Sequence, residues 1–153
     1  MSLEVDIYWM QQALKLAQQA WDGGEVPVGA ILVDEHQHIM GSGYNQMIQL
    51  HNPSAHAEIL ALQAAGMTKR NYRLTHTTLY VTLEPCCMCA GAMVHARIQR
   101  LVFGAFDPKT GAAGSVFNLL TGDKLNHRIH VEGGCLEVEC ATLLKNFFKT
   151  RRG

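Results

Sequence analysis

The spacing of apolar residues divides the N-terminal part of the chain into a helix and a hairpin. In the first segment they recur every three or four positions, at Ile7, Met10, Leu14, Ala17 and Trp21. This spacing predicts an amphipathic helix that ends at Gly23-Gly24, where a left-handed cap costs little. Residues 28–34 and 38–44 are short apolar, β-branched stretches on either side of a polar segment, which predicts two antiparallel strands.

The rest of the chain alternates between helical and strand-like segments. Asn52-Pro53-Ser54 offers capping residues and a proline suited to a first turn, and we expect a helix from there through His56 to about Gly66. Further strands are predicted at 77–83, 100–104 and 129–132, and further helices at 87–97 and 137–151. The alternation predicts one α/β domain over residues 1–153, a three-layer α/β/α sandwich with a five-stranded mixed sheet.

The composition bears on the compartment in which the protein works. The N-terminus is acidic and no run of about 18 apolar residues occurs, so we expect a soluble, cytoplasmic protein with no membrane partner. Five cysteines, three of them at positions 86, 87 and 89, do not resemble a secreted disulfide framework. They favour metal binding in a reducing compartment.

The net charge of zero conceals an uneven distribution. Residues 1–60 hold seven acidic residues and one lysine, whereas residues 61–153 hold twelve lysines or arginines and six acids. The basic half suits an anionic ligand, although an ordinary solvated surface explains the charge equally well. The balance argues against a protein that coats nucleic acid, for which a pI above about 9 is expected.

Two cysteines at a predicted strand-to-helix junction form a candidate metal site. Cys86 and Cys89 are three residues apart at a helix start and project on one side, while Cys87 points elsewhere. The positive end of the helix favours their thiolate forms. A C-x-x-C pair alone is equally typical of a redox protein or of half a structural zinc site, which Cys135 and Cys140 could complete.

A second motif favours a catalytic metal over these alternatives. His56-Ala57-Glu58 stands at another predicted helix start, and H-x-E followed by P-C-x-x-C is the signature of zinc deaminases. One histidine and two thiolates leave the fourth tetrahedral position of one Zn²⁺ to a water, which the metal converts to hydroxide. Glu58 is then expected to act as the general acid and base that carries protons, and not as a metal ligand.

Longer stretches extend the match over nearly the whole chain. They are EVPVGAILV at 25–33, HAEILAL at 56–62, TLYVTLEPCCMCAGAMVHARI at 78–98, VFGAFDPKTGAAGS at 102–115, NHR at 126–128 and FFKTRR at 147–152. With these the chain resembles the bacterial tRNA-specific adenosine deaminases of the cytidine and deoxycytidylate deaminase superfamily. The resemblance implies a cytidine-deaminase-like fold, a homodimer, and hydrolytic deamination of adenosine to inosine at the wobble position of a tRNA anticodon loop.

The resemblance also implies residues that contact RNA. Val28, Asn45 and Ala57 would line the pocket for the base, with Asn45 hydrogen-bonding the flipped nucleoside, and Asp107 and Lys109 would meet neighbouring nucleotides. Simple packing explains Val28 and Ala57 as well, and a turn explains Asn45 or Asp107. In the C-terminal segment aromatic and basic side chains could stack on bases and hold phosphates: Phe147, Phe148, Lys149, Arg151 and Arg152. The aromatic pair could equally belong to the core.

Three other functions fit part of this pattern. A deaminase of the same fold acting on guanine or cytosine would keep the metal ligands and Glu58. A zinc-stabilised RNA-binding module without catalysis would keep the metal but have no use for Glu58. A redox protein would use Cys86 and Cys89 as a dithiol. The chain also departs from its relatives at Phe106, where a basic residue is common, and at Cys87, where an aliphatic residue is common.

Overall fold

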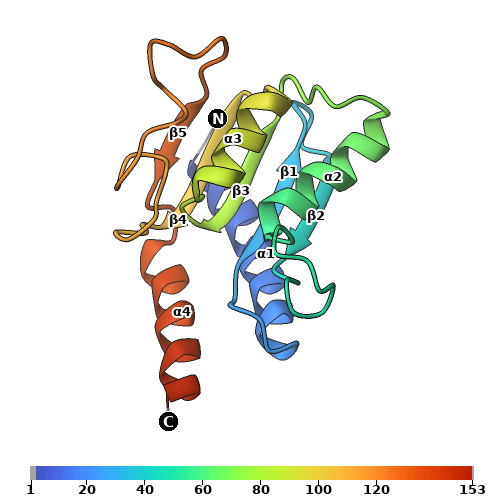
Figure 1. Cartoon of the computed structure of the whole chain (residues 1–153). Coiled ribbons are helices and arrows are strands. Elements are labelled where there is room, and N and C mark those ends of the chain that lie inside the picture. The colour runs from blue at the N-terminus through green and yellow to red at the C-terminus, as the bar shows by residue number, and fades with distance from the viewer. Residues whose placement is uncertain (1–2, 153) are drawn as a thin grey trace.

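Helices and strands follow one another in the order that the apolar pattern predicts (Figure 1). The computed structural model describes residues 3–152, with side chains as far as Arg151. In chain order the elements are α1 (Leu3–Asp22), β1 (Gly29–Val33), β2 (Ile39–Tyr44), α2 (Ala57–Lys69), β3 (Thr78–Leu83), α3 (Cys87–Ala96), β4 (Arg100–Ala105), β5 (His130–Gly133) and α4 (Glu137–Arg152). The predicted strand ends agree with these bounds to within about one residue.

The five strands form one mixed sheet in the order β2-β1-β3-β4-β5. Strand β1 pairs antiparallel with both β2 and β3, whereas β3, β4 and β5 run parallel to one another. Ala30 of β1 lies opposite Val81 of β3, and Val81 lies opposite Phe103 of β4. The prediction of a five-stranded mixed sheet is therefore confirmed.

Helices cover both faces of this sheet, as predicted. Figure 1 shows α2 and α3 in front of the sheet and α1 behind it. Glycines mark where each helix approaches most closely: Gly41 lies against the backbone of α2, and Gly29 lies against the backbone of α1. Gly104 lies against Cys140 of α4, and its position in β4 places α4 on the same face as α1. The result is a three-layer α/β/α sandwich.

The core lies between these layers. Its largest fully buried side chains include Tyr80, Phe103, Met10, Leu32 and Met93, which come from the sheet and from the helices on both of its faces. Burying each such side chain contributes roughly 1.5–3 kcal/mol. Among residues 3–152 no helix is both long and apolar enough to cross a membrane.

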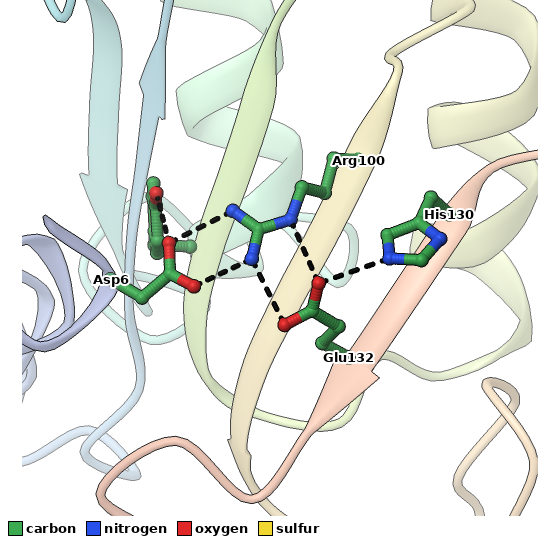
Figure 2. A network of polar contacts seen from close by, with 5 residues as sticks. Asp6, Arg100, His130 and Glu132 are labelled. Atoms are coloured by element: carbon green, nitrogen blue, oxygen red, sulfur yellow. Dashed lines mark hydrogen bonds and ion pairs between the residues drawn. The ribbon is translucent and has the colours of Figure 1, made fainter. Parts of the chain in front are cut away.

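A buried ion pair joins α1 to the sheet (Figure 2). Two nitrogens of Arg100 in β4 donate to the carboxylate of Asp6 in α1, at 2.8 and 2.5 Å. The hydroxyl of Tyr80 in β3 donates to the same carboxylate at 2.7 Å. On its other side Arg100 contacts Glu132 of β5, which also lies 3.0 Å from His130. The network thus links the first helix to three strands.

Helix α2 differs from its prediction at both ends. Asn52 does not cap the helix, because its side chain accepts from the amide and hydroxyl of Ser54 and closes a local turn instead. Pro53 therefore lies before the helix, and the N-cap is His56. At the other end α2 continues past Gly66 and stops at Arg70, which adopts a left-handed conformation with φ of 55°.

Candidate metal centre and active site

The predicted metal ligands lie at the starts of two neighbouring helices. His56 is the N-cap of α2 and Cys86 is the N-cap of α3. Both residues have extended backbones, and neither side chain makes the hydrogen bond that normally caps a helix. Their side chains are therefore available to bind beyond the helix ends. Cys89 lies one turn into α3, on the same side as Cys86.

The three side chains converge with the spacing of a tetrahedral zinc site. The Nδ1 atom of His56 lies 3.7 Å from the sulfur of Cys86 and 3.5 Å from the sulfur of Cys89. Two tetrahedral ligands about 2.3 and 2.05 Å from a zinc ion are about 3.6 Å apart. Within the described residues these three ligand atoms form the group that fits a metal, all within 4.8 Å of one another. A fourth position is left for water, as in catalytic zinc sites.

Charge in the cluster also suits a cation. The thiol of Cys89 and the ring of His56 hydrogen-bond to the sulfur of Cys86 and lower its pKa to about 4. The hydrogen bond with Cys86 raises the pKa of His56. The pKa of Cys89 is raised because its thiol donates to the Cys86 thiolate, and burial adds to this effect. Cys86 is thus ready to bind as a thiolate, and metal binding would release the proton of Cys89 and any proton on the Nδ1 atom of His56.

Glu58 lies beside this cluster in the first turn of α2. Its side chain is 4% exposed. Burial raises the pKa of Glu58 to about 7, and the negative charge of Cys86 adds to the effect. A carboxyl group with a pKa near neutrality can both accept and return a proton, which is what a general acid and base must do.

Asn45 fixes the start of α2 from the neighbouring loop. Its side-chain oxygen accepts from the amide of Ala57 at 2.9 Å, and its nitrogen donates to the carbonyl of Val26 at 3.0 Å. The amide oxygen and nitrogen can each make one further hydrogen bond. The predicted contact of Asn45 with a nucleoside therefore stays a prediction beside an observed structural role.

Val28 and Ala57 lie in the core. Both are buried, and Ala57 has no exposed surface. Their packing accounts for the choice of small apolar residues at these positions, so the base contacts that the resemblance implies stay predictions.

Asp107 and Lys109 lie on the loop after β4, as predicted. The Asp107 carboxylate accepts from the amides of Lys109 and Thr110 and from the Thr110 hydroxyl, which closes a turn and leaves Lys109 exposed. Two buried carboxylates hold neighbouring loops, and no motif in the sequence marks them. Glu25 accepts from the amides at 48 and 49, and Glu84 accepts from the loop that carries Asp107.

The C-terminal aromatic residues have different environments. Phe147 is 4% exposed and packs edge-on against Trp21 of α1, with ring centroids 5.2 Å apart. This packing fits the alternative that the ring belongs to the core, and its stacking on RNA stays a prediction. Phe148 is 45% exposed and stays a candidate. The guanidinium of Arg151 lies 4.8 Å from the centroid of Phe147, and the side chain of Arg152 lies outside the described residues.

The remaining cysteines do not join the cluster. The group of potential metal ligands within the described residues contains neither Cys135 nor Cys140, so the closed four-cysteine site is not formed. All five cysteines are free, and Cys86 and Cys89 form no disulfide.

The fold and this site together define a zinc-binding deaminase. A family model for the cytidine and deoxycytidylate deaminase zinc-binding region matches residues 3–105, which include His56, Cys86 and Cys89. The chain belongs to this family.

Two similar proteins have a stated substrate. The tRNA-specific adenosine deaminase of Haemophilus influenzae is 52% identical over 149 residues, which cover 97% of this chain and 86% of that protein. The tRNA-specific adenosine deaminase of Buchnera aphidicola is 48% identical, over 96% of this chain and 96% of that protein.

Solved structures agree on the fold. One from studies of A-to-I editing by tRNA deaminases at the wobble position of transfer RNA superposes with a TM-score of 0.85 at 39% identity, covering 90% of this chain and 99% of that one. A guanine deaminase from Nitrosomonas europaea superposes with a TM-score of 0.79 at 23% identity, over 90% of this chain and 81% of that one. At that identity the second structure supports the fold and not the substrate.

Proposed function

We infer that this protein deaminates adenosine to inosine at the wobble position of a tRNA anticodon loop. The observation that carries the inference is the convergence of His56, Cys86 and Cys89 next to the buried Glu58. Identity of 52% to a tRNA-specific adenosine deaminase over 97% of this chain directs the choice of substrate. The proposed zinc ligands are His56, Cys86 and Cys89, with one zinc per subunit.

In this reaction Glu58 moves the protons. Zinc, when bound to the three ligands, lowers the pKa of a water and makes it nucleophilic. Glu58 takes a proton from the attacking water and delivers it to N1 of the adenine, while the water oxygen bonds to C6. Glu58 then takes the remaining proton from the hydroxyl group on C6 and delivers it to the departing amine, and the C6–N6 bond breaks as the C6=O bond forms. One water is consumed, and inosine and ammonia are formed.

An anticodon loop suits a site of this kind. A base in an unpaired loop is extracted more easily than one in a duplex. Lys109 and Phe148 are both exposed, and we assign them, with Asp107 and the basic residues at 149, 151 and 152, to the nucleotides around the target. Cations hold phosphates and an aromatic ring stacks on a base, whatever the sequence.

The activity is expected of residues 1–153 as a single domain in the cytoplasm. Both faces of one sheet contribute to one core, and five free cysteines suit a reducing compartment. A tRNA substrate is found there as well.

The same proposal includes a homodimer formed through α2 and α3. An open, mainly apolar hollow of about 1140 Å³ lies along α2 and the second half of α3, lined from Ile59 to Ala96. Met67 is 81% exposed at its edge, and Tyr72 is also exposed. A second copy of the chain, packed on this surface, would shield it from water.

Met67→Glu places a charge on this surface and should convert the dimer to monomers, as measured by light scattering. Ile39→Glu, on an exposed part of β2, is the control and should leave the mass of the particle in solution unchanged.

The test of the activity uses purified protein and an anticodon stem-loop RNA with adenosine at the wobble position. Inosine and ammonia should form in equal amounts, with about one zinc per chain. Glu58→Gln keeps the shape of the side chain but cannot carry the proton, so turnover should fall by about a thousandfold or more while zinc is retained. Glu35→Gln changes a solvent-exposed carboxylate and serves as the matched control.

The other functions predict different results. Deamination of free guanine or cytosine, with no inosine in the RNA, would contradict the tRNA assignment and support a small-molecule deaminase. RNA binding that needs zinc but is unchanged in Glu58→Gln, without any turnover in the wild type, would support a binding module.

A further inference from the structure

Glu84 is a buried acidic residue between β3 and the metal-site helix. It follows Leu83, the last residue of β3, and precedes Pro85 and Cys86. Its exposed fraction is 2%. The backbone of Glu84 is held by a hydrogen bond to β4. Its amide donates to the carbonyl of Ala105 at 2.9 Å, which continues the pairing of β3 with β4 by one residue. A rigid backbone next to a metal ligand thus carries a carboxylate into the protein interior.

That carboxylate accepts four hydrogen bonds from a single loop. One oxygen accepts from the amide of Asp107 at 3.0 Å and from the hydroxyl of Ser115. The other accepts from the amides of Ala113 and Ser115, each at 3.0 Å. The donors span the whole loop of residues 107–115, so one side chain holds both ends of it.

The loop is closed tightly around Glu84. The amide of Ala112 donates to the carbonyl of Pro85 at 2.8 Å, which adds a backbone contact next to the carboxylate. A Cβ atom on Gly111 would lie 2.5 Å from a carboxylate oxygen of Glu84 and 2.5 Å from the carbonyl oxygen of Asp107. No side chain fits between the loop and the carboxylate without displacing one of them.

None of the ion pairs among the described residues involves Glu84, so the loop amides and a hydroxyl stabilise its charge. A buried carboxylate is costly unless such donors surround it, and hydrogen bonds to a charged acceptor are about twice as strong as neutral ones. The loop and the carboxylate therefore hold each other in one arrangement.

We propose that Glu84 is a positioning residue that sets the loop of residues 107–115 against the start of α3, and so sets its contact with RNA beside the metal site. The proposal rests on the proposed function for the role of the loop. Lys109 is the exposed basic residue of this loop, and the turn that presents it begins at Asp107, whose amide Glu84 holds. Through this chain of contacts the distance between Lys109 and the metal ligands is fixed before RNA binds.

Two variants loosen the loop from opposite sides. Glu84→Gln replaces an acceptor oxygen by an NH₂ group, which must face amide donors that it cannot bind. Gly111→Ala leaves Glu84 in place and pushes the loop away from it. Gly122→Ala is the matched control, because a Cβ there meets no atom within 4 Å. Trypsin cleavage after Lys109, zinc per chain, and kcat and KM for the stem-loop RNA are measured for each.

Both loosened variants should be cleaved after Lys109 about tenfold faster than the wild type, since each loses at least one charge-assisted hydrogen bond. Their KM for the RNA should rise by about tenfold, with kcat within about threefold of the wild type and one zinc retained. Gly122→Ala should match the wild type in every measurement.

The opposite pattern would overturn the proposal. If Glu84→Gln loses zinc or kcat while cleavage after Lys109 and KM stay as in the wild type, Glu84 serves Cys86 and not the loop. If the loop opens in both variants and KM does not change, the loop has no part in RNA binding. A wild-type protein that makes no inosine would contradict the proposed function instead, and cleavage after Lys109, measured on the protein alone, still decides whether Glu84 holds the loop.

Discussion

Three neighbouring cysteines have three different environments. Cys86 is half-buried at the N-cap, Cys89 is buried one turn later, and Cys87 between them is exposed. The helical spacing explains this, because residues three apart share a side and the residue next to the cap does not. Neighbours in sequence therefore have separate roles.

This difference predicts how the cysteines respond to substitution. Cys89→Ala removes one of the three proposed metal ligands, so zinc affinity should fall by at least about a hundredfold and turnover with it. Cys87→Ala removes an exposed thiol that points away, and zinc affinity should not change. Competition with a chromogenic chelator measures both. Equal losses in the two variants would mean that the assignment of ligands is wrong.

At the same scale the sequence predicted the metal cluster but not its supports. Cys86 and Cys89 are recognisable because helix geometry relates residues within one turn, and His56 is recognisable from the H-x-E and P-C-x-x-C signature. Glu84 gave no such signal, since the donors that surround it come from a loop more than twenty residues later in the chain. The environment of Phe147 could not be read from the sequence for a similar reason: contact with Trp21 depends on where α1 and α4 meet.

At the scale of elements, α2 and β2 approach unusually closely. A Cβ on Gly41 would lie 2.6 Å from the amide nitrogen of Ala65, and alanines on this side of α2 leave no side chain that could yield. The helix therefore rests on the strand backbone, and the helix start that carries His56 and Glu58 is held at a fixed height above the sheet.

Gly41→Ala should consequently destabilise the protein. Overpacking at a backbone contact costs about 1–3 kcal/mol, and we expect a loss of free energy of unfolding in that range. Urea denaturation measures it, with Gly122→Ala as a control that should lie within about 0.5 kcal/mol of the wild type. A Gly41→Ala variant as stable as the wild type would show that α2 can move away without cost.

Element types and strand ends were predictable from periodicity, whereas the start of α2 was not. Asn52-Pro53-Ser54 has the composition of a helix start, yet Asn52 binds Ser54 locally. Asx turns and helix caps use the same residues, and tertiary contacts decide between them. Here Asn45 binds the first helical amide from another loop and fixes the boundary at His56.

At the scale of the whole molecule, the Asp6–Arg100 pair joins α1 to the sheet (Figure 2). Burial alone would raise the pKa of Asp6, but hydrogen bonds from Arg100 and Tyr80 and the charge of Arg100 outweigh it and hold the pKa below the ordinary value of 3.8. The folded state therefore favours the ionised form of Asp6 more than the unfolded state does. The pair makes its full contribution to stability above the unfolded pKa of 3.8. The stabilisation is lost as the pH falls through the lowered pKa.

Asp6→Asn should therefore lower the free energy of unfolding at neutral pH, and the loss should become smaller as the pH falls. Removing one member of a buried pair leaves Arg100 poorly compensated, and we expect a loss of about 3 kcal/mol at pH 7. Urea denaturation of variant and wild type at several pH values gives the difference, in which effects common to both cancel. Asp22→Asn, an exposed change in the same helix, should show no such dependence. A difference that stays constant down to pH 2 would contradict this account.

Apart from the β1–β2 hairpin, the order of the strands could not be predicted from the sequence. Periodicity predicts that a segment is a strand but not which strand lies beside it, and β1 lies between β2 and β3 only because α2 crosses back over the sheet. Arg100 and Asp6 are ninety-four residues apart in the chain, so their pairing could be recognised only in the folded molecule.

The distance along the chain between His56 and Cys86 has a consequence for the unfolded protein. The two residues are thirty positions apart, with all of α2 and all of β3 between them. Whenever one ion holds both, that stretch becomes a closed ring, which removes about 3.5 kcal/mol of conformational entropy from the denatured chain. In polymer terms the site is a reversible cross-link, opened by a chelator in the way that a reductant opens a disulfide.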